Sequence, residues 1–239
     1  MVPFSKSRPP LLAPPPTTLI GALAYPLSRS LKLSEAFGEY SGAERLRGSL
    51  KYVGLKINLP LIDYFDLSKI TFFYRKKAER DAVAIGKTYT LFKGLKYEVP
   101  TITICYVVDE EVARCSLGED VRRKLIEAAI GITRIGSRES LATPLSLSYG
   151  EARSISQRRG KTGFSFIRRS ISSLLSGDFV GVEVIDWEKY PIGDYYHARR
   201  ELMIIPYDSI KYVSKPVEVE LSEDYTFVDV GGELVIARR

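Results

Sequence analysis

The single histidine of the chain lies among residue types that metal-independent RNA cleavage uses. His197 stands in the run Asp194-Tyr-Tyr-His-Ala-Arg-Arg-Glu201, where phenol and guanidinium groups flank the imidazole. Such cleavage needs a base for the 2′-hydroxyl, an acid for the leaving oxygen and cations for the charged transition state. Neighbours in sequence fix no mutual geometry. The run therefore makes His197 a candidate catalytic residue and leaves a non-catalytic surface loop as the alternative.

A second region interleaves cations with aromatic rings. Residues 72–96 begin with Phe-Phe-Tyr-Arg-Lys-Lys and end with Lys-Thr-Tyr-Thr-Leu-Phe-Lys-Gly-Leu-Lys. Single-stranded RNA is held in this way, because cations follow the phosphates while rings stack on unpaired bases. The alternative is a solvated lysine-rich hairpin whose phenylalanines pack on the core. The predicted RNA-binding residues here are Arg75, Lys76, Lys77, Arg80, Lys87, Tyr89, Phe92 and Lys93.

Basic residues also recur beside small residues elsewhere in the chain. Arg134 and Arg138 flank Gly136, whose missing side chain would let the backbone approach RNA closely. The Ser- and Gly-rich stretch 154–176 carries further cations and suits a flexible loop that contacts phosphates. An ordinary charged surface is the alternative. The predicted RNA contacts in that stretch are Arg158, Arg159, Lys161, Arg168 and Arg169.

Two motifs that would bring a cofactor are incomplete. Gly-Lys-Thr occurs at 86–88 and at 160–162, but neither copy has the glycine that a P-loop places five residues earlier. Cys105 and Cys115 are the only cysteines, and neither has a second cysteine or a histidine at metal-ligand spacing. We therefore expect no metal and no cofactor. Cys105 lies in an apolar run and is expected to be a buried small hydrophobic residue.

The composition is that of a globular protein of the cytoplasm. The 239 residues carry a net charge of +6, which is compatible with a polyanionic partner. Prolines interrupt the apolar segment Leu11–Leu27, which excludes a signal peptide and a membrane span, so no membrane partner is expected. Asn58 and Gln157 are the only side-chain amides, a depletion typical of hyperthermophile proteins.

A proline-rich arm precedes the first predicted helix. Pro14-Pro-Pro-Thr-Thr-Leu-Ile-Gly-Ala-Leu-Ala24 begins with three residues that exclude helix and favour an extended approach. Thr17 or Thr18 is then expected to cap the helix through its hydroxyl, and the exposed amides of the first turn would suit phosphate. Pro26 is expected to end or bend the helix. Its apolar face is predicted to comprise Leu19, Ile20, Leu23 and Leu27.

The next elements suggest a compact α+β unit. Ser49–Leu59, Ser68–Lys76 and Thr101–Asp109 are predicted strands, residues 119–131 a helix, and Ile132–Ser140 a further strand. Behind the first helix, this order is that of a ferredoxin-like (RRM-like) βαββαβ unit without its first strand. We place this domain at residues 1–143.

The remaining residues, 144–239, are predicted to form a mostly β domain. A loop is expected at Leu145–Gly150, and Gly231-Gly232 marks a two-residue hairpin turn between two alternating runs. The expected strands are Val180–Ile185, Leu202–Ile205, Val217–Leu221, Thr226–Val230 and Leu234–Ala237.

Two segments resemble the Cas-five family of the RAMP superfamily. The run PPPTTLIGALAYPL is similar to the N-terminal signature of the subunit found in archaeal type I-A Cascade, a CRISPR interference complex. Ile132-Thr-Arg-Ile-Gly-Ser-Arg-Glu-Ser-Leu141 resembles the internal IG-S-(K/R)-ES segment of the same family. Family members begin with a strand ahead of the first segment, whereas only sixteen proline-rich residues stand there in this chain. A shortened N-terminus is the interpretation we favour.

The resemblance implies a function. It indicates a non-catalytic subunit that binds the 5′ handle of a guide RNA and contacts the Cas-seven backbone subunit and other Cascade subunits. It places a projecting thumb near residues 72–100 and makes Thr17 and Thr18 candidate RNA contacts at the start of the first helix. One branch of the family processes precursor RNA, so a metal-independent endoribonuclease that uses His197 is the alternative.

Overall fold

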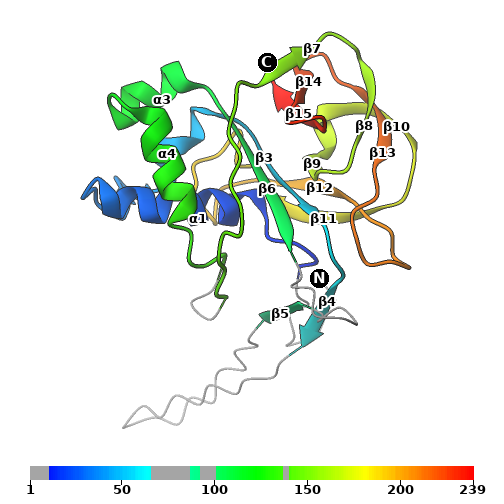
Figure 1. Ribbon diagram of the computed structural model, residues 1–239, viewed down its shortest axis with the longest axis horizontal. Coiled ribbons are helices and arrows are strands. Elements are labelled where there is room, and N and C mark those ends of the chain that lie inside the picture. The colour runs from blue at the N-terminus through cyan, green and yellow to red at the C-terminus, as the bar shows by residue number, and fades with distance from the viewer. Residues whose placement is uncertain (1–10, 66–86, 92–100, 137–139) are drawn as a thin grey trace.

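The computed structural model describes residues 11–65, 87–91, 101–136 and 140–239. The fold is mixed α/β, with helices gathered on one side and antiparallel sheets on the other (Figure 1). The first part of the chain contains α1 (Pro16–Ser30), β1 (Ala36–Phe37), β2 (Tyr40–Ser41), α2 (Glu44–Arg47), β3 (Leu50–Ile57), β4 (Leu61–Phe65), β5 (Lys87–Leu91), β6 (Ile102–Val108), α3 (Glu110–Leu117) and α4 (Val121–Ile130).

The second part is almost wholly β. It contains β7 (Arg153–Ile155), β8 (Arg159–Thr162), β9 (Phe166–Ile167), a 3-10 turn (Arg168–Ser170), β10 (Ile171–Ser176), β11 (Phe179–Ile185), β12 (Arg200–Pro206), β13 (Val217–Leu221), β14 (Tyr225–Asp229) and β15 (Leu234–Arg238). These strands form three antiparallel sheets, in the orders β10-β13-β8, β11-β12-β9 and β15-β14-β7.

Helix α1 forms as predicted but is capped differently. Its four predicted core residues are at most 3% exposed. The predicted threonine cap is wrong, because the N-cap is Pro15 and its carbonyl accepts from the amides of Thr18 and Leu19. Proline is well placed at the first helical position, where no N–H is needed. The helix also continues through Pro26 to Ser30, and Leu27, directly after this proline, is buried in the core.

Strands β3 and β6 pair antiparallel from Leu50↔Val108 to Ile57↔Ile102, so both predicted strands are confirmed. Helix α4 is also confirmed, with Val121 and Ala128 buried. Helix α3 was not predicted, and Asp109 caps it by accepting a hydrogen bond from the Val112 amide. The strand expected at residues 132–140 does not form in its described residues, 132–136 and 140, where Gly136 has φ +95° and Arg134 forms an isolated bridge with Leu141.

Most of the predicted strands of the second part are confirmed within one or two residues. Gly231 and Gly232 both have positive φ and form the turn between β14 and β15. The stretch 154–176 is not the flexible loop expected, because β8, β9 and β10 run through it. Buried apolar residues of this stretch fix those strands, among them Phe164, Phe166 and Ile171.

The largest hydrophobic cluster joins the two parts of the chain. It combines Leu19 and Leu55 with Trp187, Met203 and Ile205, all of them at most 2% exposed. Helix α1 is therefore covered by residues from both sides of position 143. The division into domains at this position stays a prediction, and the core is continuous across it.

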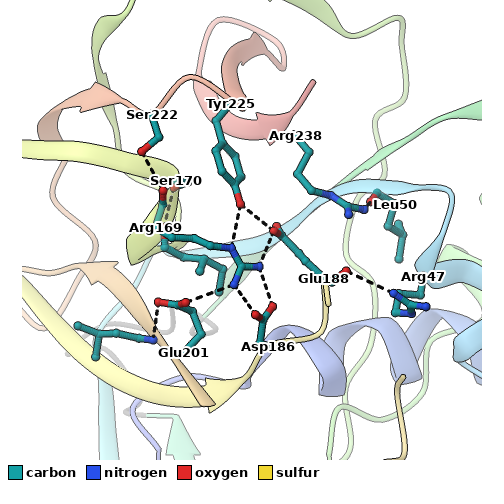
Figure 2. A network of polar contacts seen from close by, with 12 residues as sticks. Arg47, Leu50, Arg169, Ser170, Asp186, Glu188, Glu201, Ser222, Tyr225 and Arg238 are labelled. Atoms are coloured by element: carbon teal, nitrogen blue, oxygen red, sulfur yellow. Dashed lines mark hydrogen bonds and ion pairs between the residues drawn. The ribbon is translucent and has the colours of Figure 1, made fainter. Parts of the chain in front are cut away.

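A partly buried arginine joins three segments of the second part (Figure 2). The guanidinium of Arg169 forms a bidentate ion pair with Asp186, one contact of which is 2.6 Å, and contacts Glu188 at 2.7 Å and Glu201 at 3.2 Å. The Arg169 Nε donates to the Tyr225 hydroxyl at 3.1 Å, and that hydroxyl donates to Glu188 at 2.8 Å. We call this set of five residues the Arg169 network.

The Arg169 network gives its members unusual proton affinities. Burial alone would lower the pKa of Arg169, but hydrogen bonds to Asp186 and Glu188 raise it above its usual value. Burial and the Glu188 carboxylate raise the pKa of Tyr225 to about 12. The donors of Arg169 are committed to carboxylates and a phenol, which gives this residue an internal role. Its contact with RNA stays a prediction.

Replacing Arg169 should destabilise the fold. The Arg169→Met variant keeps the bulk of the side chain but leaves Asp186 and Glu188, whose side chains are 7% and 8% exposed, without their cation. Loss of one partner from such a buried set lowers the free energy of unfolding by about 3–5 kcal/mol. The matched control, Arg159→Met, removes an exposed cation and should change it by less than about 1 kcal/mol. Equal losses in chemical denaturation of the two variants would show that the Arg169 network is not a major source of stability.

Candidate nucleic-acid interface

The two segments singled out in the sequence line one groove. Helix α1 forms its floor, residues 133–136 one wall, and residues 35–43 together with 192–195 the other wall. The groove has a volume of about 420 Å³. Its polar lining comprises Thr17, Thr18, Ser28, Glu35, Ser41, Thr133 and Arg134, and its aromatic lining Tyr25 and Tyr195.

The floor is a second face of α1. Thr18, Gly21, Tyr25 and Ser28 follow one another at helical spacing and line the groove, while the apolar residues of α1 face the core. A Cβ at Gly21 would meet no atom within 4 Å, so the space above this position is open. The groove therefore owes part of its depth to a glycine in the middle of a helix.

In the first turn of α1, the groups that could bind a ligand are mainly the threonine hydroxyls and not the backbone amides. Pro16 has no N–H, and the amides of Thr18 and Leu19 already donate to the Pro15 carbonyl. The site expected for phosphate at this helix N-terminus is thus weaker than the sequence suggested. Gly136 approaches the same turn, since a Cβ there would lie 3.8 Å from Thr18 Cγ2.

Arg134 contributes a cation to the groove. Its guanidinium lies over the Tyr25 ring, 4.4 Å from the ring centroid. The Tyr25 hydroxyl accepts a hydrogen bond from Arg29 at 3.1 Å, which raises the pKa of Arg29. This stacking orients a planar guanidinium in the lining of the groove, an arrangement suited to phosphate or to a base edge.

The opposite wall is tied to α2. The Ile192 amide donates to Glu44 Oε2 at 2.8 Å, and the Ile192 carbonyl accepts from the Ser41 amide at 3.0 Å. Gly193 has φ +117°, and a Cβ there would lie 2.7 Å from the Ser41 nitrogen. Only glycine therefore allows this close approach, which brings Tyr195 to the groove.

The other basic candidates lie apart from the groove lining. On neighbouring strands, Arg159 pairs with Glu220 at 3.3 Å and Lys161 with Glu218 at 4.0 Å, directly across the β8–β13 ladder. These glutamates partly neutralise the cluster, which weakens its attraction for phosphate. Arg158 and Arg168 donate to backbone carbonyls, those of Leu221 and Ile171.

The basic-aromatic region is only partly described. Lys87 and Tyr89 belong to β5, which pairs antiparallel with β4, opposite Phe65 and Asp63. The remaining candidates of this region, together with Arg138 and the predicted strand Ser68–Lys76, lie outside the described residues: Arg75, Lys76, Lys77, Arg80, Phe92 and Lys93. Their roles stay predictions.

His197 occupies an exposed turn beside the groove. Its side chain is 85% exposed, and Nδ1 lies 3.0 Å from Asp194 Oδ1, which also accepts from the His197 amide. These bonds lower the pKa of Asp194. The pair orients the imidazole with Nε2 directed away from Asp194.

The sequence reasoning missed Tyr25, Glu35 and Tyr195 as members of the site. The spacing of Thr18, Gly21, Tyr25 and Ser28 carried a signal, since small and polar residues recur on one face of α1. Tyr195 drew attention only as a neighbour of His197 in the catalytic candidate, and Glu35 comes from a distant segment that gave no signal. Within the described ranges, no cluster of three potential metal ligands occurs and no helix is long and apolar enough to cross a membrane.

Comparison with known proteins places this chain among CRISPR proteins. No family model matches it. Two proteins of Saccharolobus solfataricus, named CRISPR system aCascade subunit Cas5 1 and CRISPR-associated protein Cas5 3, are each 30% identical over 239 residues, which span 97% of this chain and 90% of the relative. The chain therefore belongs to the Cas5 family, as the two sequence segments indicated.

A solved structure has the same fold. A CRISPR protein from Archaeoglobus fulgidus superposes with a TM-score of 0.67 at 24% identity, covering 99% of this chain and 91% of that one. At this identity the likeness concerns the fold alone. It supports the mixed α/β architecture with antiparallel sheets.

Filling the groove at Gly21 should leave the fold intact. The Gly21→Leu variant places a side chain in open space and replaces a poor helix former with a good one. The free energy of unfolding should rise by about 0.5–1 kcal/mol, which is a rise in melting temperature of roughly 1–4 °C. A lower melting temperature than that of the wild type, measured by calorimetry, would show that the space above Gly21 is occupied.

Proposed function

We propose that the chain is a non-catalytic RNA-binding subunit of a type I-A Cascade complex in the cytoplasm. In this proposal it holds the 5′ handle of the guide RNA and contacts the Cas-seven backbone subunit and other Cascade subunits. One observation carries the proposal. The two segments that resemble the family signature, at Thr17-Thr18 and at Arg134–Gly136, line the same groove.

The chemistry of the groove supports this proposal. Hydroxyl groups, one oriented guanidinium and two tyrosine rings are the groups that contact phosphates, ribose hydroxyls and unpaired bases. The name of one relative, an aCascade subunit, supports membership of such a complex. Among the described elements, the order α1, β3, β6, α4 matches the central αββα part of a ferredoxin-like unit, and on this basis we propose that architecture for the first domain.

The basic-aromatic region would supply a second contact. Strands β4 and β5 pair antiparallel, from Leu61↔Leu91 to Phe65↔Lys87, and so bring the two ends of residues 66–86 together. We propose that this region acts as the thumb beside the handle, with its cations on phosphates and its rings on bases.

The groove can be tested with guide RNA that contains the 5′ handle. Gly21→Leu should block the groove and Arg134→Ala should remove its cation, so both should weaken binding in fluorescence anisotropy. Arg134→Ala should also remove one phosphate contact, so the negative slope of log K against log salt should become shallower by roughly 0.7. Gly150→Leu is the matched control, since this glycine also faces open space and is not part of the groove. Wild-type affinity in both groove variants would refute the assignment of this site.

The thumb can be tested independently by charge reversal. Lys76→Glu together with Lys77→Glu should weaken binding of the same RNA by about tenfold or more, because two attractions become repulsions. Circular dichroism should show an unchanged fold. An unchanged affinity would remove residues 72–96 from the RNA interface.

The contact between Asp194 and His197 favours a second candidate function. A histidine held by a carboxylate is a common general base, and His197 has an outward Nε2. A metal-independent endoribonuclease would cleave a labelled repeat RNA in the presence of a chelator. We expect no cleavage. Cleavage by the wild type that is lost in His197→Ala would favour the enzyme over the non-catalytic subunit.

A further inference from the structure

The loop 194–200 exposes aromatic rings to an unusual degree. Tyr196 is 96% exposed and Tyr195 is 67% exposed. The residues that follow, His197, Arg199 and Arg200, are exposed as well. Large apolar rings normally find packing partners, because their burial stabilises the fold. These rings contribute little to the core, so their position calls for another explanation.

The loop is nevertheless held in one shape by backbone bonds. Asp194 donates its amide to the Pro191 carbonyl at 3.2 Å, and its carboxylate accepts from the His197 amide at 3.0 Å. The Tyr195 amide donates to the Gly193 carbonyl at 3.1 Å. At the far end, the Arg199 carbonyl accepts from the Asp186 amide at 3.0 Å, next to the Arg169 network. The rings are therefore presented on a fixed support, which lowers the entropy lost when a ligand binds.

The loop continues the groove. Tyr195 lines the groove opposite Arg134, and Tyr196 follows immediately outside it. Arg199 and Arg200 add exposed cations at the end of the loop, and Glu183 lies 3.7 Å from Arg200 as the neighbouring anion. Rings next to cations, at the mouth of a polar groove, are the arrangement that binds single-stranded nucleic acid.

We propose that Tyr195 and Tyr196 form a stacking platform for unpaired bases of the RNA strand that leaves the groove. The proposal rests on the proposed function and adds a base-binding surface to it. It also gives the residues around His197 a binding role in place of a catalytic one. We favour RNA over a protein partner because charged or ionisable side chains, those of Asp194, His197 and Arg199, flank the two tyrosines in the loop.

The experiment compares RNA with an analogue that has no bases. The full chain is titrated with a labelled single-stranded oligouridine and with an abasic ribose-phosphate strand of the same length. Tyr195→Ala with Tyr196→Ala should weaken oligouridine binding by about tenfold and leave abasic binding unchanged. Tyr195→Phe with Tyr196→Phe should bind like the wild type, because the rings remain. Tyr149→Ala, which removes a 69% exposed ring away from the groove, is the surface control.

The outcomes separate this proposal from the function on which it rests. If the double alanine variant binds oligouridine normally while Arg134→Ala does not, the platform is refuted and the groove stands. Equal losses toward both strands would mean that the loop contributes charge or shape, and this too refutes stacking. If the double variant keeps its RNA affinity but fails to join other Cascade subunits in gel filtration, the loop is a protein interface. Absence of RNA binding by the wild type would overturn both proposals.

Discussion

The ion pairs of the Arg169 guanidinium hold together the segments that support one wall of the groove. The guanidinium is shared by Asp186, Glu188 and Glu201 and is bonded to Tyr225, so it joins β12, β14 and the segment that follows β11. The chain continues from this segment to Ile192 and Tyr195. The backbone carbonyl of Glu188 accepts from Arg47, and Arg47 pairs with Glu44, which holds the Ile192 amide. A continuous set of polar contacts thus runs from the Arg169 network to one wall of the groove.

This arrangement concentrates negative charge inside and leaves positive charge outside. Three carboxylates surround one guanidinium. Such a set is stable only because each carboxylate contacts the cation, and Glu188 also accepts a hydrogen bond from the Tyr225 hydroxyl. On the surface, Glu218 and Glu220 neutralise the cations of β8 across the sheet. The net charge of +6 is therefore a poor guide to where a polyanion would bind. The orientation of single cations such as Arg134 is a better one.

Residue spacing and turn chemistry in the sequence predicted the helices, strands and turns that depend mainly on residues near one another in the chain. The apolar face of α1, the strands β3 and β6, helix α4 and the turn at Gly231-Gly232 all follow from spacing or from turn chemistry. Residues 154–176 were misjudged, because their many Ser and Arg residues concealed the alternating buried residues that make strands. The threonine cap failed because the helix begins at Pro16, so both threonines already lie inside its first turn. The groove brings residues 17–43 together with two distant segments, 133–136 and 192–195, and no pattern within one segment predicts such a contact.

At Gly21, the shape of the binding groove can change without a loss of fold stability. A position in a binding groove is usually also a packing position, so a change of ligand preference tends to cost stability. Here the space above the helix belongs to the groove, since no atom lies within 4 Å of a Cβ placed at Gly21. Single substitutions at this position would therefore change the depth of the groove while the core beneath α1 stays as it is. The groove is thus free to diverge between related chains in step with the ligand that each one meets.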